Sequence, residues 1–84
     1  MNDSTIENAV VRRLQRRGIR TLKLNLQSNR GWPDRLVILP KGQVVWLEFK
    51  VPKGRLTKLQ EYVHGWLRRQ GHRVEVVTDK EFEL

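Results

Sequence analysis

Two segments of the chain carry apolar residues at helical spacing. The first runs from Ser4 to Arg17, and its apolar side chains fall on one face of a helix that turns about 100° per residue: Ile6, Val10, Val11 and Leu14. Ser4 and Glu7 fit a capping box with Ser4 as the N-cap, and Gly18 suits the position just after a helix end. We therefore predict an amphipathic first helix.

The second helical segment begins at Thr57 and ends at Arg69 or Gln70. Its apolar face consists of Leu56, Leu59, Val63, Trp66 and Leu67. Thr57 and Gln60 again fit a capping box, and Gly71 follows the segment. These features predict a second amphipathic helix.

Four shorter segments have the composition and alternation of strands: residues 19–26, 35–39, 43–49 and 73–77. The tight turn Pro40-Lys41-Gly42 joins the middle two, so these must be antiparallel neighbours. The last strand follows a helix, and a strand–helix–strand crossover within one sheet is expected to be parallel and right-handed. The order helix, strand, strand, strand, helix, strand predicts an α/β fold, a small mixed sheet flanked by helices, in a single domain of residues 1–84.

Composition narrows the setting and the partner. The 84 residues contain no cysteine, no apolar run of about 18 residues and no signal-peptide pattern, so we expect a cytoplasmic protein without disulfides or a membrane span. The formal net charge is +8, from 17 Lys and Arg against 9 Asp and Glu. In so small a domain this charge favours a polyanionic partner, and a nucleic acid fits best.

Against this basic background, three charged residues converge where two predicted strands meet. Asp34 stands at the mouth of one strand, and Glu48 and Lys50 stand near the end of the next, on the same face as Trp46. Each residue alone is explained by the exposure of strand ends to water. Together they suit metal-assisted phosphodiester hydrolysis, because paired carboxylates bind a hard cation and a nearby lysine can orient the attacking water or neutralise charge on the phosphate. The Phe49 carbonyl could add a further ligand.

These residues also carry a resemblance. Pro33-Asp34 with Glu48-Phe49-Lys50 resembles the PD-(D/E)xK nuclease superfamily, and Gly31-Trp32-Pro33-Asp34, Leu47 to Lys50 and Gln60 resemble its VRR-NUC family. The likeness extends from Glu7 to about Val77. It implies a restriction-endonuclease-like core and a Mg²⁺- or Mn²⁺-dependent endonuclease acting on DNA.

The resemblance also implies roles for individual residues. Asp34 and Glu48 would bind the metal, with Glu7 and the Phe49 carbonyl as further ligands, Lys50 would handle the water, and Gln60 would position it. Two of these residues have an alternative, purely structural role, because Glu7 and Gln60 can each cap a helix. His64 and His72 are too few and too scattered for a histidine metal site, and we assign them no chemistry.

Basic residues supply candidate DNA contacts, which we predict at Arg12, Arg13, Arg16, Arg30, Lys53 and Arg55. Trp32 could stack on a base or pack beneath its loop, and the core role is favoured. Stand-alone relatives in the family resemble four-way (Holliday) junction resolvases that act as homodimers, and small size suggests a phage or other mobile element. Two alternatives stay open, namely a non-catalytic nucleic-acid-binding module and a flap or sequence-specific nuclease of the same superfamily.

Overall fold

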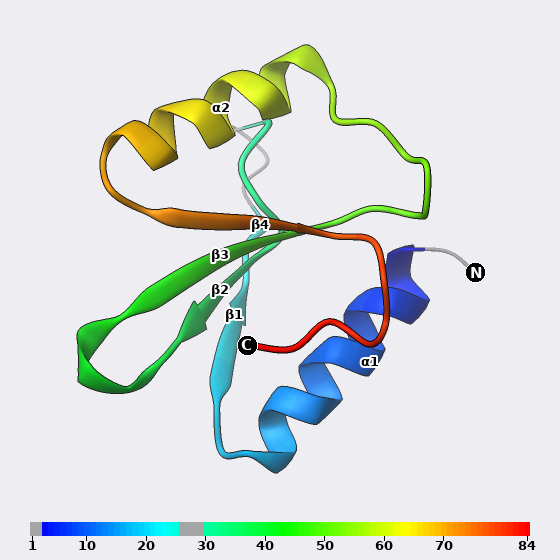
Figure 1. Ribbon diagram of the computed structural model, residues 1–84, viewed down its shortest axis with the longest axis vertical. Coiled ribbons are helices and arrows are strands. Elements are labelled where there is room, and N and C mark those ends of the chain that lie inside the picture. Colours follow the sequence, from blue (N-terminus) through cyan, green and yellow to red (C-terminus); the bar gives the residue numbers. More distant parts are fainter. Residues whose placement is uncertain (1–2, 26–29) are drawn as a thin grey trace.

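The computed structural model describes residues 3–25 and 30–84 of the chain (Figure 1). Its elements follow the predicted order: α1 (Asp3–Arg16), β1 (Arg20–Lys23), β2 (Arg35–Ile38), a 3-10 turn (Pro40–Gly42), β3 (Val44–Phe49), α2 (Lys58–Arg69) and β4 (Arg73–Val77). The first strand is shorter than the predicted 19–26, and Leu26 lies outside the described residues. Among the described residues, no helix is long and apolar enough to cross a bilayer.

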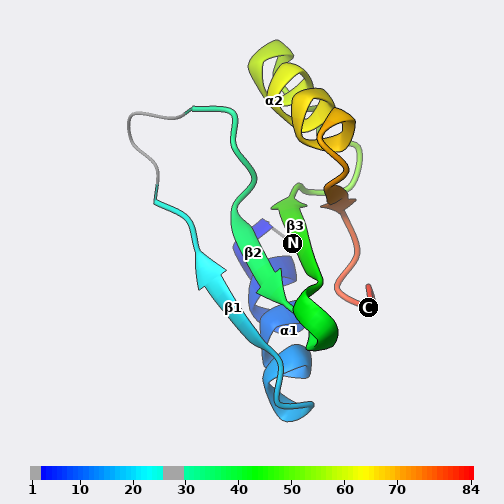
Figure 2. The same cartoon turned by 90° about the vertical axis from the view of Figure 1, so that its left-hand side faces the viewer.

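The four strands form one mixed sheet in the order β1-β2-β3-β4. The pairs β1–β2 and β2–β3 are antiparallel and β3–β4 is parallel, so the predicted antiparallel middle pair and parallel crossover are both observed. Figure 2 shows β1 on the side of the sheet away from β4. The predicted small mixed sheet flanked by helices is therefore confirmed.

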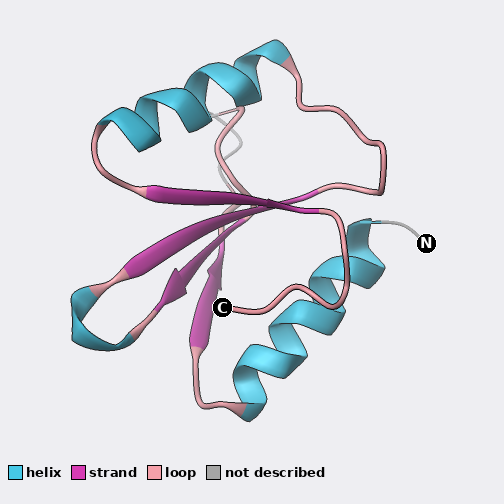
Figure 3. Cartoon of the chain, viewed as in Figure 1, coloured by secondary structure: helices cyan, strands magenta, loops and turns pink. Residues whose placement is uncertain are grey.

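The two helices cover opposite faces of this sheet, as Figure 3 shows. The face toward α1 holds the main core, in which Val45, Leu47 and Phe49 of β3 pack with the α1 face of Ile6, Val10 and Leu14. The face toward α2 holds a smaller cluster of Val63, Leu67, Val74, Trp32 and Trp46. The predicted alternation along β3 is thus observed, and it turns Glu48 toward α2.

Two local predictions are wrong. α1 begins at Asp3, which places Ser4 inside the first turn, and the Glu7 carboxylate binds Lys23 and Arg35 rather than capping the helix. On α2, the side chains of Leu59 and Trp66 are 47% and 42% exposed. Because α2 meets the sheet through a narrow stripe of Val63, His64 and Leu67, these two predicted core positions lie outside it.

Candidate active site

Asp34 and Glu48 are brought together by the pairing of β2 with β3. Arg35 lies opposite Leu47 in the register, so Asp34 and Glu48 come just before one strand and near the end of the other. The Asp34 amide donates to the Leu47 carbonyl at 2.9 Å, and the Phe49 amide donates to Asp34 Oδ2 at 2.8 Å. Backbone hydrogen bonds therefore fix the Asp34 carboxylate against the end of β3.

The Asp34 carboxylate is partly buried and lies beside Glu48. The pKa of Asp34 is raised to about 6, chiefly by burial. The hydrogen bond from the Phe49 amide acts to lower this pKa, and the adjacent Glu48 carboxylate acts to raise it. When Asp34 ionises, it is repelled by the adjacent, buried Glu48 carboxylate. A divalent cation relieves such repulsion and takes oxygen ligands, so this pair suits one.

Glu48 is held from the α2 side. Its side chain is buried, at 2% exposed, and it faces two residues of that helix. Gln60 Nε2 lies 3.5 Å from Glu48 Oε2, and His64 Nε2 lies 3.5 Å from Glu48 Oε1. Within the described part of the chain, Glu48 Oε1 has no hydrogen-bond partner, which leaves an acceptor free for a ligand. This orphaned oxygen is a second feature that fits a cation.

His64 is the residue that the sequence argument missed. It is fully buried and contacts the candidate metal ligand Glu48, whereas the sequence pattern indicates no chemistry for it. The available signal was its spacing from Gln60, because residues four apart lie on the same side of a helix. A histidine in sequence carries no sign of burial, so the spacing alone did not single it out.

Gln60 caps α2, and its predicted role in positioning the water stays a prediction. Its backbone amide donates to Thr57 Oγ1 at 3.0 Å, and its Oε1 accepts from the Thr57 amide at 2.9 Å, so the predicted capping box is confirmed. The same side chain presents its amide nitrogen to Glu48. Lys50, half-buried, follows the end of β3 and is anchored by its amide hydrogen bond to the Val77 carbonyl at 3.0 Å.

Glu7 approaches the same end of the sheet from α1, but its carboxylate is already paired. Glu7 Oε2 accepts hydrogen bonds from Lys23 Nζ at 2.7 Å and from Arg35 Nε at 2.6 Å. Burial raises the pKa of Glu7, but these two cations outweigh it and bring the pKa below its usual value. The charge of Glu7 also contributes to the raised pKa of Asp34. The role of Glu7 as a metal ligand stays a prediction. Within residues 3–25 and 30–84, the structure contains no group of three acidic or histidine side chains that is close enough together to hold a metal ion.

The predicted DNA contacts separate into two groups. Arg30, Lys53 and Arg55 are exposed on the loops that precede Asp34 and follow Lys50. Arg12 and Arg16 are exposed on α1, and Arg16 lies about nine residues, or roughly 13 Å along the axis, beyond Glu7.

Arg13 is occupied within the fold. It donates to the Phe82 carbonyl at 2.6 Å and to the Lys80 carbonyl at 2.7 Å, which ties the C-terminal segment to α1. Ion pairs with Glu81 and Glu83, at 3.8 and 3.9 Å, add to this attachment. Its predicted role in DNA binding stays untested beside this structural one.

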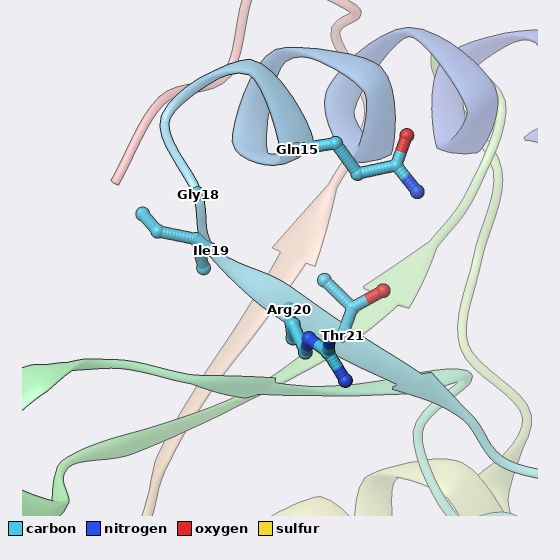
Figure 4. A pocket seen from close by; sticks show the side chains of 5 residues that line it. All are labelled: Gln15, Gly18, Ile19, Arg20 and Thr21. Carbon is cyan, nitrogen blue, oxygen red and sulfur yellow. The ribbon is translucent and has the colours of Figure 1, made fainter.

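A separate hollow of about 400 Å³ lies where α1 turns into β1. Figure 4 shows its lining, with Gln15 on the helix facing Thr21 on the strand and Ile19 at the turn between them. Arg20 is its one charged lining residue, and it contains none of the carboxylates described above. The chemistry of the site therefore lies elsewhere, at the opposite end of the β1–β2 pair.

Comparison with known proteins agrees with this geometry. No protein-family model matches the chain. "Putative nuclease p44" of Acyrthosiphon pisum secondary endosymbiont phage 1 is 32% identical over 81 residues, which cover 96% of this chain and 87% of that protein. A solved structure described as a VRR_NUC domain matches with a TM-score of 0.85 and 28% identity, covering 94% of this chain and 86% of its own.

The chain belongs to the VRR-NUC family of nucleases. The match covers 94% of this chain, and the predicted restriction-endonuclease-like core is confirmed as a VRR-NUC fold. In this VRR-NUC domain, the motif residues Asp34, Glu48 and Gln60 meet at one end of the sheet.

Proposed function

We propose that this protein is a Mg²⁺- or Mn²⁺-dependent endonuclease that hydrolyses phosphodiester bonds in DNA. The observation that carries the proposal is that Asp34 and Glu48 lie side by side, where burial and, to a smaller extent, Glu48 raise the pKa of Asp34 to about 6. Two negative charges so close together weaken phosphate binding unless a cation bridges them. A purely DNA-binding module explains the net charge of +8 but has no use for this pair.

Asp34 and Glu48 would hold the cation, and the Phe49 carbonyl is proposed as a third oxygen ligand. When bound, such a cation supplies Lewis-acid stabilisation of the charge that develops on the phosphate. The hydrogen bond from the Phe49 amide fixes one Asp34 oxygen and leaves the other for the ion. Gln60 would orient the Glu48 carboxylate through the contact of its Nε2 with Glu48 Oε2.

Lys50 is the proposed group that acts on the reacting atoms. It follows Glu48 by two residues, which by strand alternation directs its side chain to the same face as that carboxylate. A lysine ammonium there can orient the attacking water or neutralise the phosphate in the transition state. Arg30, Lys53 and Arg55 would contact phosphates on either side of the cleaved bond.

The substrate we propose is branched DNA, with a four-way junction as the preferred form and a homodimer as the active species. Two symmetric cuts in a junction require two sites related by a two-fold axis, which a dimer supplies. Support comes from the VRR-NUC fold and from the high positive charge of a small domain. Flap and sequence-specific cutting are the alternatives.

The deciding experiment is cleavage of end-labelled DNA by the wild type, Asp34→Ala and Lys50→Ala, in Mg²⁺, in Mn²⁺ and with a chelator. Four-way junction, flap, linear duplex and single strand are compared side by side. Paired symmetric nicks in the junction, lost with the chelator and in both variants, are the expected result. Glu61→Ala, which removes an exposed carboxylate from the same helix as Gln60, should cut normally. Tight binding without metal-dependent cutting of any substrate would overturn the proposal.

Glu7 is tested separately with Glu7→Gln. If Glu7 leaves Lys23 and Arg35 to join the metal, the variant needs more Mg²⁺ for half-maximal activity than the wild type. If the variant is destabilised but its Mg²⁺ requirement is unchanged, Glu7 acts only through its ion pairs with Lys23 and Arg35 and is not a metal ligand.

A further inference from the structure

An aromatic recess lies beside the candidate active site and takes no part in the mechanism above. It has a volume of about 230 Å³ and is lined by Trp32, Tyr62, Val63 and Trp66. Tyr62 and Trp66 are 66% and 42% exposed, although such large aromatic rings are usually packed away from water. Three of the six Phe, Trp and Tyr residues of the chain therefore line one small surface feature.

Contacts between tilted aromatic rings hold the Trp32 side of the recess in place. Trp32 lies 5.6 Å from Trp46 and 6.1 Å from Trp66 between ring centroids, the second pair edge to face. Trp46 in turn donates from Nε1 to His72 Nδ1 at 3.0 Å. Aromatic pairs in such tilted arrangements attract each other beyond simple burial, so the walls are largely preformed.

Charge along α2 indicates what the recess would bind. Lys58 stands four residues before Tyr62 and Arg69 seven residues after it, so both lie on the exposed side of the helix that carries the two rings. Cations that flank exposed aromatic rings are typical of single-stranded nucleic-acid binding, in which bases stack on the rings and phosphates pair with the cations. An apolar patch without charges would suit a protein partner equally well. The cations on either side of the rings favour a nucleic acid over a protein partner.

The position of the recess relates it to the cleaved bond. Trp32 precedes Asp34 by two residues in the loop that leads into β2. The same loop therefore carries one wall of the recess and one of the two carboxylates. Its volume lies below the range of about 300 to 1,000 Å³ typical of small-molecule pockets, which suits a single ring system.

We propose that this recess binds one unpaired nucleobase of the substrate strand, stacked on Trp66 and Tyr62 next to the candidate active site. The proposal rests on the proposed function in one respect, that the ligand is DNA. It adds a reason for structure selectivity, because a base can enter only where it has left the helical stack.

The test measures binding without cleavage, in a chelator, by fluorescence anisotropy of three labelled duplexes. One is fully paired, one carries a single bulged thymidine, and one carries an abasic residue in the same bulge. The wild type should bind the thymidine bulge roughly tenfold more tightly than the abasic bulge, the scale of one aromatic stacking contact. Equal affinities for the two bulges would overturn the proposal.

Variants localise the effect. Trp66→Ala and Tyr62→Ala should lose the preference for the thymidine bulge, and Trp66→Phe should keep it. Ile38→Ala is the matched control, because it removes an exposed apolar side chain from the far end of β2. If Trp66→Ala still prefers the thymidine bulge, the recess is not the site that binds the base. The proposal is also overturned if the wild type self-associates and Trp66→Ala abolishes this self-association without changing the preference for the thymidine bulge.

Failure of the two proposals can be told apart. A thymidine-bulge preference without any metal-dependent cleavage would leave the recess standing and remove the nuclease. Normal cleavage with equal binding of the thymidine and abasic bulges would do the reverse.

Discussion

The imidazole Nε2 of His64 lies 3.5 Å from Oε1 of Glu48, and neither atom has a hydrogen-bond partner among the residues that the structure describes. Both side chains are buried, at 0% and 2% exposed. A buried polar atom without a partner costs free energy, so a small shift that forms this hydrogen bond is favourable. The same carboxylate oxygen has a second lone pair, which remains for a cation. We therefore infer that His64 positions the Glu48 carboxylate.

We predict that His64→Ala lowers kcat by about 10- to 100-fold and raises the Mg²⁺ requirement, the usual scale for residues that orient a metal ligand. His64→Gln should restore much of the loss, because it keeps a donor near Glu48. Leu67→Ala is the control, since it removes buried bulk from the same helix without touching the carboxylate. Equal losses of kcat in all three folded variants would show that His64 acts only through packing.

We predict that the raised pKa of Asp34 makes the metal-free protein less stable as the pH rises. Ionisation of Asp34 is disfavoured in the folded state, so its contribution is fully present below about pH 4 and lost as the pH passes about 6. Asp34→Asn should raise the free energy of unfolding at pH 8 by about 1 kcal/mol, allowing for partial exposure, and change it little at pH 4.

The measurement for Asp34 is urea unfolding across this pH range, taken as the difference between variant and wild type. The difference matters because the lowered pKa of Glu7 acts in the opposite direction, with stability lost as the pH falls. Mg²⁺ or Mn²⁺ should raise the melting temperature of the wild type at pH 8 but not that of Asp34→Asn. A difference independent of pH would contradict the raised pKa.

Gly31 is predicted to be essential for placing Asp34. A Cβ at this position would lie 2.7 Å from Leu59 Cγ and 3.0 Å from the Leu59 carbonyl oxygen, and φ is +87°. Gly31→Ala should therefore destabilise the protein by about 2 kcal/mol and reduce cleavage, because the loop must shift away from α2. Thermal melts and cleavage rates check this.

Gly42→Ala is the matched control for Gly31, since its φ is +74° but nothing lies within 4 Å of the added Cβ. It should show the backbone strain alone, about 1 kcal/mol, with normal cleavage. Equal effects of the two substitutions on cleavage would argue against the clash with Leu59.

Two neighbouring arginines are predicted to behave differently. Arg13→Ala should lower the melting temperature, because it releases the C-terminal segment from α1. Arg12→Ala should leave the melting temperature unchanged and weaken DNA binding, reducing the slope of log affinity against log salt by about 1 if Arg12 contacts a phosphate. Titrations at several salt concentrations measure this slope, and an unchanged slope would remove Arg12 from the DNA-binding surface.

The sequence by itself determined the elements and their pairing. Apolar periodicity placed both helices, and the short Pro40–Gly42 connection forced β2 and β3 to be antiparallel neighbours, which in turn brought Asp34 beside Glu48. These are local constraints, since side-chain alternation and turn length act over a few residues. The capping box of Thr57 and Gln60 was predictable for the same reason.

The tertiary structure decided what each side chain faces. Glu7 fits a capping box in sequence, yet its carboxylate binds Lys23 and Arg35 from two other elements. The packing of α2 on the sheet through a narrow stripe of residues buries His64 beside Glu48 and leaves Trp66 exposed. Such outcomes depend on contacts between residues far apart in the chain, and periodicity within one segment carries no information about them.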